Sequence, residues 1–204
     1  TDTAYKVEYY LQNLEDDNYT LDHIDELEGT TDTLATAEIK DFAHFTYNAR
    51  QSTISDNING DGSRVLVVKY TRDKYGIVAN NNNAKAGTSA QINGTYKFDK
   101  EITLSATTNA GYTFLGWYEG EDLVCESEEF TFNVEKGVTY TATWFTHTDT
   151  EYKVEYYLQN LEDNNYTLDH TDTLRGTTDT LATAEIKDFA HFTYNASAST
   201  ISGN

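Results

Sequence analysis

The stretch "YKVEYYLQNLED" occurs twice in this chain, first at residues 5–16 and again, letter for letter, at residues 152–163. The match extends over 57 aligned positions, of which eight differ. Residues 73–147 occur once, between the two copies. Because internal repeats set the architecture of a chain, we predict a β module at residues 1–72, a different β module at 73–147, and a truncated second copy of the first module at 148–204.

The repeated stretch predicts a half-buried β-strand. Its residues 5, 7, 9 and 11 are aromatic or aliphatic and alternate with Lys6, Glu8, Tyr10 and Gln12, which is the period of a strand with one face toward a core. The acidic run "LEDDN" at residues 14–18 predicts a turn, and "YTLDHIDELEG" predicts the returning strand.

Three differences between the copies fall on alternate residues of that returning strand. Ile24, Glu26 and Glu28 correspond to Thr171, Thr173 and Arg175. Alternate residues share one face of a strand, so we expect this face to be solvated. The opposite face is the same in both copies, and we expect it to point inward; it carries Tyr19, Leu21, His23 and Leu27.

The remainder of the first module contains one ambiguous segment and one apolar strand. Residues 34–42 are compatible with a short helix or an irregular strand. "STISDNINGDGSRVLVVKYTR" predicts a hairpin around Gly60–Gly62. Its second strand, "VLVVKY", is apolar on both faces, which is typical of a central strand.

The middle module predicts an antiparallel meander. Ile102, Leu104 and Ala106 alternate with polar residues, as do residues 130–134 and 138–144. The same alternation places Trp117 and Trp144 in the core rather than on a sugar-stacking surface. We therefore expect a mainly β chain of small β-grasp-like modules or antiparallel meanders, with at most one short helix per module.

Charge and composition exclude several classes of partner. The formal net charge is -20 in 204 residues, so the surface repels phosphate backbones, and we expect no nucleic acid partner. No run of about 18 apolar residues occurs, and we expect no membrane insertion. Cys125 is the single cysteine, so an intrachain disulfide cannot form.

Specific motifs connect the chain to known repeats. The segments "YKVEYYLQNLEDDNYTL", "GTTDT" and "DGSRVLVVKYTR" resemble mucin-binding-protein-like (MucBP-like) repeats. "GTYKFDKEITLSATTNAGYTFLGWYEGEDLV" and "FTFNVEKGVTYTATW" resemble the divergent InlB B-repeat, the Listeria-Bacteroides-type repeat. In the first module, "FAHF" stands where the resemblance implies a Gly-Phe pair. These likenesses imply compact β modules in tandem on a bacterial cell surface, without enzymatic activity.

Candidate sites are few. Asn57, Asn59 and Asp61 precede Gly62 in the order N-x-N-x-D-G, which matches part of a calcium loop. The twelfth position of that loop is Val68 rather than an acid, and a hairpin turn uses the same residues. We prefer the turn, and we expect no metal, cofactor or catalytic residue. The exposed aromatic candidates for ligand binding are Tyr10 and Tyr157.

Three functions follow as expectations. The first is a repetitive stalk or spacer of a secreted adhesin, anchored to the cell wall through regions outside this chain. The second is a module that binds host glycan or mucin. The third is a subunit of a polymerising extracellular filament. We expect partners among neighbouring repeats of the same protein, and we expect residues 148–204 to be the least stable segment and the most inclined to self-associate.

Overall fold

The computed structural model describes residues 2–89 and 92–203, so the predicted end positions Thr1 and Asn204 lie outside the described residues. The mainly β fold class is confirmed: within this part of the chain the regular elements are strands and two three-residue 3-10 helices, η1 (Ala49–Gln51) and η2 (Ala196–Ala198). The chain divides into two compact units. Unit 1 comprises Thr1–Ala79, Gln91–Leu104 and Glu129–Tyr140, and unit 2 comprises Asn80–Ala90, Ser105–Glu128 and Thr141–Asn204.

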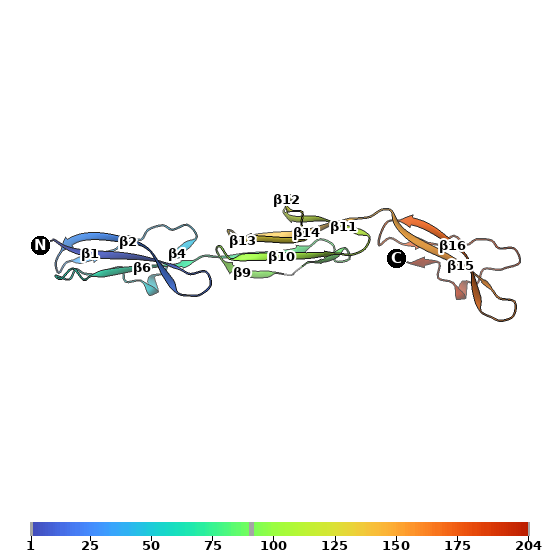
Figure 1. The fold of residues 1–204 in the computed structure, drawn as a ribbon, viewed down its shortest axis with the longest axis horizontal. Helices are drawn as coiled ribbons and strands as arrows, with labels where there is room; N and C mark the ends of the chain where they lie inside the picture. Colours follow the sequence, from blue (N-terminus) through green and yellow to red (C-terminus); the bar gives the residue numbers. More distant parts are fainter. Residues whose placement is uncertain (1, 90–91, 204) are drawn as a thin grey trace. The chain divides into compact units, whose positions relative to one another are not determined.

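The first copy forms a four-stranded sheet in unit 1, in the order β2-β1-β6-β4 (Figure 1). Its strands are β1 (Asp2–Gln12), β2 (Tyr19–Thr30), β4 (Phe45–Tyr47) and β6 (Val65–Arg72). Strand β6 runs parallel to β1 and antiparallel to β4, which confirms that "VLVVKY" is a central strand. A small two-stranded sheet pairs β3 (Leu34–Thr36) with β5 (Ser55–Asn57).

The structure settles one local prediction for the first copy and contradicts another. Of the two alternatives left open for residues 34–42, the irregular strand is the one observed, as β3, and the 3-10 helix lies further along, at η1. The segment around Gly60–Gly62 does not close a hairpin, because β5 pairs with β3 while β6 pairs with β1 and β4. Parallel strands need a crossover connection, and β3 to β5 supply it here in place of a helix.

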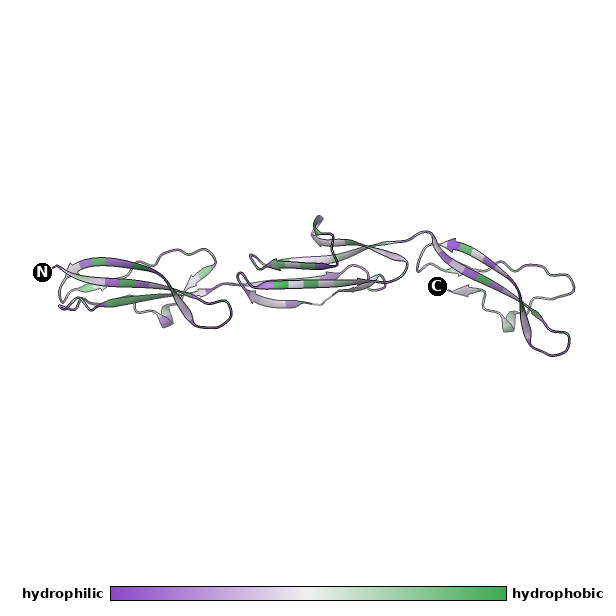
Figure 2. Cartoon of the chain, viewed as in Figure 1, coloured by the Kyte–Doolittle hydropathy of each residue, from purple (hydrophilic) through white to green (hydrophobic). Residues whose placement is uncertain are grey.

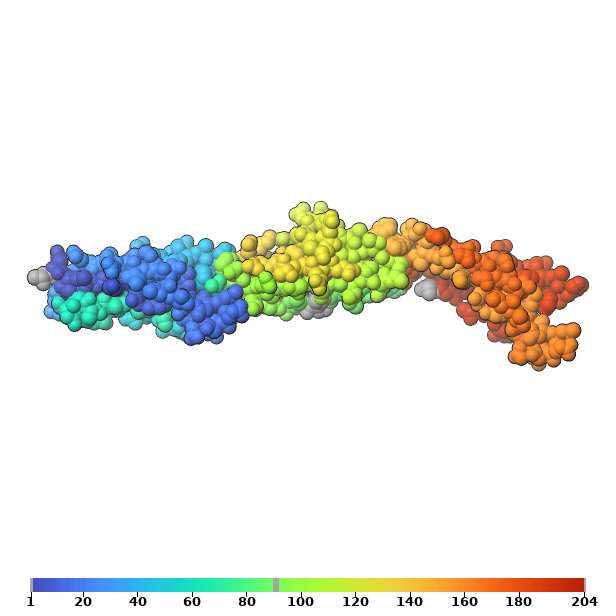
Figure 3. Space-filling model, in the orientation of Figure 1, coloured from blue at the N-terminus to red at the C-terminus, as the bar shows by residue number. Residues whose placement is uncertain are grey.

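Alternation along β1 and β6 produces the core of the first copy. Val7 and Tyr9 of β1 are fully buried, as are Leu66 and Val68 of β6, whereas their neighbours in sequence point to the opposite face. Figure 2 shows this as alternating green and purple along the strands. In the space-filling view, the blue atoms of β1 and β2 lie beside the cyan-green atoms of β6 (Figure 3).

The middle segment consists of strands from both units. A five-stranded sheet has the order β12-β11-β14-β7-β9, and a three-stranded sheet has the order β13-β10-β8. Trp117 is fully buried and Trp144 is 6 % exposed, as predicted for core residues. The strands are β7 (Lys74–Asn81), β8 (Gly87–Ser89), β9 (Asn93–Lys97), β10 (Glu101–Thr108), β11 (Tyr112–Glu119), β12 (Asp122–Cys125), β13 (Glu129–Asn133) and β14 (Val138–Thr146).

The second copy, in unit 2, repeats the local structure of the first. Strands β15 (Thr150–Gln159) and β16 (Tyr166–Gly176) pair antiparallel with the same bulge as β1 and β2. Strands β17 (Ala182–Thr183) and β18 (Ser202–Gly203) correspond to β3 and β5. His44 and His191 both adopt positive φ, at 65° and 69°.

Candidate binding groove around Tyr10

The outer face of the first copy's sheet carries the candidate site. Tyr10 follows the buried Tyr9 on β1, so its side chain lies on the face opposite the core. The parallel register pairs Tyr10 with Lys69 and Glu8 with Val67, and directly paired residues share a face. The alternation of "VLVVKY" therefore presents Val67 and Lys69 beside Tyr10.

A β-bulge brings strand β2 into the same surface. Tyr9 pairs with His23, but Tyr10 pairs with Leu21, so Asp22 has no partner on β1. The extra residue shifts the alternation of β2, and Tyr19 and Leu21 come to lie on the face of Tyr10.

The prediction that one face of β2 points inward was therefore wrong for Tyr19 and Leu21. Leu21 is 42 % exposed and Leu27 is 40 % exposed. His23 and Leu27 do lie on the core side, opposite Tyr9 and Tyr5. They remain exposed because β2 is the edge strand of the sheet.

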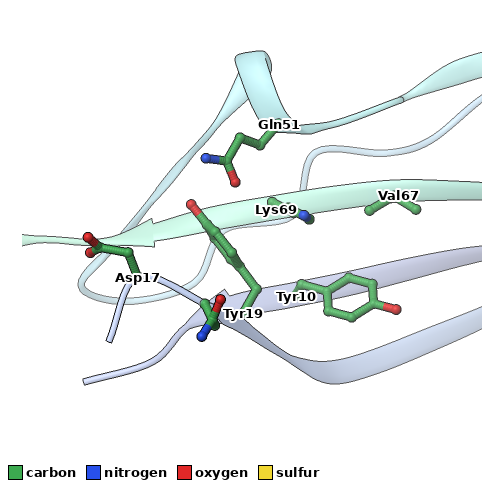
Figure 4. Close-up of a pocket in the computed structure, with 7 residues that line it drawn as sticks. Tyr10, Asp17, Tyr19, Gln51, Val67 and Lys69 are labelled. Atoms are coloured by element: carbon green, nitrogen blue, oxygen red, sulfur yellow. The ribbon is translucent and has the colours of Figure 1, made fainter. Parts of the chain in front are cut away.

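These elements enclose a shallow polar groove of about 630 Å³. Figure 4 shows Tyr10 and Tyr19 reaching it from β1 and β2, Lys69 and Val67 from β6, and Gln51 from η1. The residues that line the groove are Tyr10, Asp17, Asn18, Tyr19, Gln51, Val67 and Lys69.

Hydrogen bonds fix both tyrosines. The Tyr10 hydroxyl donates to Oε2 of Glu8 at 2.6 Å, and this bond to a carboxylate, followed by burial, raises the pKa of Tyr10. The Tyr19 hydroxyl accepts from Nδ2 of Asn48 at 3.1 Å. The Nζ of Lys69 lies 5.0 Å from the centroid of the Tyr19 ring, within cation–π range.

The groove combines aromatic surfaces with hydrogen-bonding and charged groups. Aromatic rings supply flat apolar surfaces, and the Gln51 amide, the Asp17 carboxylate and the Lys69 ammonium supply donors and acceptors around them. A carbohydrate offers the complementary surface, since a sugar ring has apolar faces and a rim of hydroxyl groups. Among residues 2–89 and 92–203, no group of three or more His, Cys, Asp and Glu residues is placed to hold a metal ion.

The equivalent surface around Tyr157 is only partly formed. Tyr157 is 50 % exposed and its hydroxyl donates to Glu155 at 2.7 Å, as Tyr10 does to Glu8. However, Ala198 stands at the position of Gln51, Asn164 stands at that of Asp17, and described residues 148–203 contain no counterpart of β6. The structure thus gathers a lined groove around Tyr10 and not around Tyr157.

Oxygen atoms of the calcium-like loop accept hydrogen bonds from Arg64 and from Ser63. Its Nη2 donates to Oδ1 of Asn59 at 3.0 Å, and its Nε donates to the carbonyl oxygen of Asn57 at 2.8 Å. Oδ1 of Asp61 accepts from the backbone N–H of Ser63 at 3.0 Å. The guanidinium group of Arg64 thus occupies two amide oxygens of this loop, those of Asn57 and Asn59.

Sequence reasoning proposed Tyr10 as a candidate and did not foresee the residues that surround it. Lys69 and Val67 had a usable signal, because the alternation of β6 places them together. Gln51 had none, since its position depends on the path of the chain between β4 and β6. Gln12 was assigned to the polar face, yet it is 7 % exposed because its Oε1 accepts from the backbone N–H of Arg72 at 3.1 Å.

In unit 2, the "FLGWY" motif has a steric explanation. Gly116 has φ of 135°, and a Cβ atom at this position would lie 2.6 Å from the carbonyl oxygen of Cys125 and 2.4 Å from Leu123. Glycine is therefore required where β12 folds back on β11. The adjacent Trp117 packs into the core, and its Nε1 donates to the carbonyl oxygen of Glu128 at 3.3 Å.

A comparison with known protein families matches the segment that contains this motif. Residues 67–148 match the family described as the divergent InlB B-repeat domain, so this segment is similar to a repeat domain of bacterial surface proteins. No curated protein matches the chain. In the part of the chain that the structure describes, there is no helix with the length and apolarity needed to cross a bilayer.

Proposed function

We propose that this chain is a non-catalytic spacer segment from the stalk of a secreted, wall-attached bacterial adhesin. The observation that carries the proposal is the near-identical repetition of one β module on either side of a segment similar to the InlB B-repeat. Duplication of a module adds length to a stalk, whereas a catalytic site needs no second copy. The net charge of -20 keeps neighbouring stalks apart by repulsion.

Contacts within unit 1 join the first copy to the middle segment, which supports this role. Nζ of Lys97 donates to the carbonyl oxygens of Asn13 at 3.0 Å and Asp16 at 2.6 Å. The ring of His44 stacks on that of Phe98 with centroids 3.9 Å apart and 7° between planes. The first contact joins the loop between β1 and β2 to Lys97 at the end of β9. The second joins His44, just before β4, to Phe98, just after β9.

Contacts within unit 2 use a different part of the repeated module. The hydroxyl of Thr178 donates to the carbonyl oxygen of Gly111 at 3.1 Å, and the Tyr112 hydroxyl donates to the carboxylate of Asp179. Thr178 and Asp179 correspond to Thr31 and Asp32, which are the same residue types in the first copy. Each copy thus carries both a loop and a turn of the kinds used to contact the middle segment, which supports neighbouring repeats as the natural partners.

Small-angle X-ray scattering tests the spacer role. A compact globule of 204 residues has a radius of gyration of about 17 Å, and we expect a clearly larger value and an extended distance distribution. Lys97→Ala combined with Phe98→Ala removes the contacts in unit 1 and should broaden the distribution. Lys153→Ala, on the exposed face of β15, is the matched surface control. A radius near 17 Å would contradict a spacer.

A second candidate function is binding of host glycan or mucin, and the groove around Tyr10 favours it. A mucin-glycan array probed with the intact chain should give saturable binding that Tyr10→Ala reduces at least tenfold. Tyr157→Ala should leave binding unchanged, because Tyr157 lacks the surrounding side chains. Equal losses for the two variants, or no binding to any glycan, would remove this candidate.

A further inference from the structure

The tripeptide Ile-Asn-Gly occurs twice in unit 1, at residues 58–60 and at residues 92–94. An asparagine that precedes glycine is exposed to attack from within the chain, because glycine has no Cβ atom to hinder its backbone nitrogen. In this reaction the glycine nitrogen attacks Cγ of the asparagine side chain, and ammonia leaves. Since the two tripeptides are identical, their surroundings decide which asparagine reacts.

The backbone of Asn93 and Gly94 is held in a ladder. Strand β9 pairs antiparallel with β7, with Gly94 opposite Ile77, and the N–H of Ala79 donates to the carbonyl oxygen of Ile92 at 3.0 Å. Every second pair of an antiparallel ladder exchanges both of its N–H···O bonds. Gly94 therefore lies in a pair whose N–H groups are bonded to the neighbouring strand, and attack by its nitrogen requires the strand to open.

The backbone of Asn59 and Gly60 lies in a turn between β5 and β6. Gly60 is exposed and Asn59 is half-buried. The N–H of Gly62 donates to the carbonyl oxygen of Asn59 at 3.0 Å and closes the turn. Within the described ranges, 2–89 and 92–203, the N–H of Gly60 donates no hydrogen bond. Its nitrogen can therefore attack without the loss of a backbone bond.

Two neighbours hold the side chain of Asn59. Nη2 of Arg64 donates to Oδ1 of Asn59 at 3.0 Å, and Nδ2 of Asn59 donates to Oγ of Ser63 at 2.9 Å. The guanidinium group is fixed in turn by Oδ2 of Asp56 at 2.6 Å and by the carbonyl oxygen of Asn57 at 2.8 Å. A fixed cation at Oδ1 stabilises the negative charge that develops on this oxygen when Cγ is attacked.

We propose that Asn59 is a self-modification site, at which the chain deamidates with water as the co-reactant. The Gly60 nitrogen loses its proton to solvent base and bonds to Cγ of Asn59. The tetrahedral adduct then expels Nδ2, which takes up a proton and leaves as ammonia, and a five-membered imide remains. Water opens the imide at Cγ to give aspartate, or at the backbone carbonyl carbon to give iso-aspartate. Overall, one side-chain amide and one water give one carboxyl group and one ammonia.

The aspartate product changes the electrostatics of the turn. It gives Arg64 an ionised acceptor in place of a neutral amide, and charge-assisted hydrogen bonds are roughly twice as strong as neutral ones. Arg64 directly precedes β6, and its carbonyl oxygen accepts from the N–H of Lys6 in β1 at 3.0 Å. Deamidation therefore strengthens the turn at the point where β6 joins β1. The proposal goes beyond the spacer role and glycan binding and depends on neither.

Peptide mapping by mass spectrometry tests the site on the intact chain, incubated at mildly alkaline pH. The peptide that contains Asn59 should lose its amide at least tenfold faster than the peptide that contains Asn93 in the same sample. In guanidinium, where the ladder of β7 and β9 is lost, the two rates should agree, because the tripeptides are identical. The proposal is overturned if Asn59 keeps its amide, or if Asn93 in the folded chain reacts as fast.

Two variants test the groups assigned to the reaction. Gly60→Ala adds a Cβ atom to the attacking residue and should slow the loss of the Asn59 amide at least tenfold. Arg64→Gln removes the guanidinium group and should slow it several-fold, in a chain whose hydrogen-exchange protection in β1 is unchanged. An unchanged rate in Gly60→Ala, or a faster reaction in Arg64→Gln with β1 still protected, would also overturn the proposal.

Discussion

Truncation of one valine in each copy measures how much stability β6 contributes. Val7 is fully buried between β6 and the rest of the core, and Val154 is its half-buried counterpart in the same local sequence. Val7→Ala removes two methyl groups, each worth about 0.8 kcal/mol of transfer free energy, and the cavity left behind raises the loss to about 2–3 kcal/mol. Val154→Ala should cost less than about 1 kcal/mol, because that side chain is only half-buried.

Guanidinium unfolding followed by two-dimensional NMR reports each copy through its own amide signals, which matters because a multidomain chain need not unfold in a single transition. Identical sequence around the two valines makes the effects on the unfolded state equal. The difference between the two losses therefore reports packing in the folded state. Equal losses in the two copies would refute the argument that β6 creates the core.

Substitutions at three further positions test separate parts of the structure. Trp144 is 6 % exposed, and Trp144→Ala should destabilise the middle segment by about 3–5 kcal/mol in thermal unfolding; a loss below about 1 kcal/mol would place it on the surface. The hydrogen bond from Lys40 lowers the pKa of Asp25, so its stabilisation is present above the unfolded pKa of about 3.9 and is lost as pH falls through the lower folded value. Asp25→Asn should flatten the acid limb of a pH titration of stability, and an unchanged limb would contradict this. His44 combines a positive φ with stacking on Phe98; His44→Ala should cost about 1 kcal/mol more than His44→Gly, because glycine adopts that φ without strain, and equal losses in calorimetry would speak against backbone strain.

Sequence periodicity predicted the properties that are local to a strand. Alternation identified Val7 and Tyr9 as core residues, and the apolar run of β6 predicted a central position in its sheet. It could not identify the partner of that strand. The pairing of β6 with β1 joins residues about 60 positions apart in sequence, and an alternating pattern carries no information on which strand lies next to it. A local hairpin was the wrong choice for this reason.

The bulge at Asp22 explains why only part of the groove could be predicted. One unpaired residue reverses the face of every side chain beyond it, so Tyr19 lies beside Tyr10 rather than in the core. Asp22 is not a glycine, and nothing in "LDHID" marks the irregularity. The positive φ of His44 was likewise not predicted: the resemblance implied a glycine near that position, and His44 adopts this φ with its ring stacked on Phe98.

Identical modules in one chain raise the question of why their strands do not exchange. In the first copy, β6 is joined covalently to β1 through residues 13–64, so it competes for that edge at an effective concentration on the order of millimolar. A free strand at micromolar concentration is then disfavoured by about 10³-fold, or about 4 kcal/mol. A β6-type peptide added to the intact chain should therefore leave the hydrogen-exchange protection of β1 in the first copy unchanged. The same covalent advantage lets a repetitive protein keep many equivalent edges without mispairing, because each edge is occupied from within its own module.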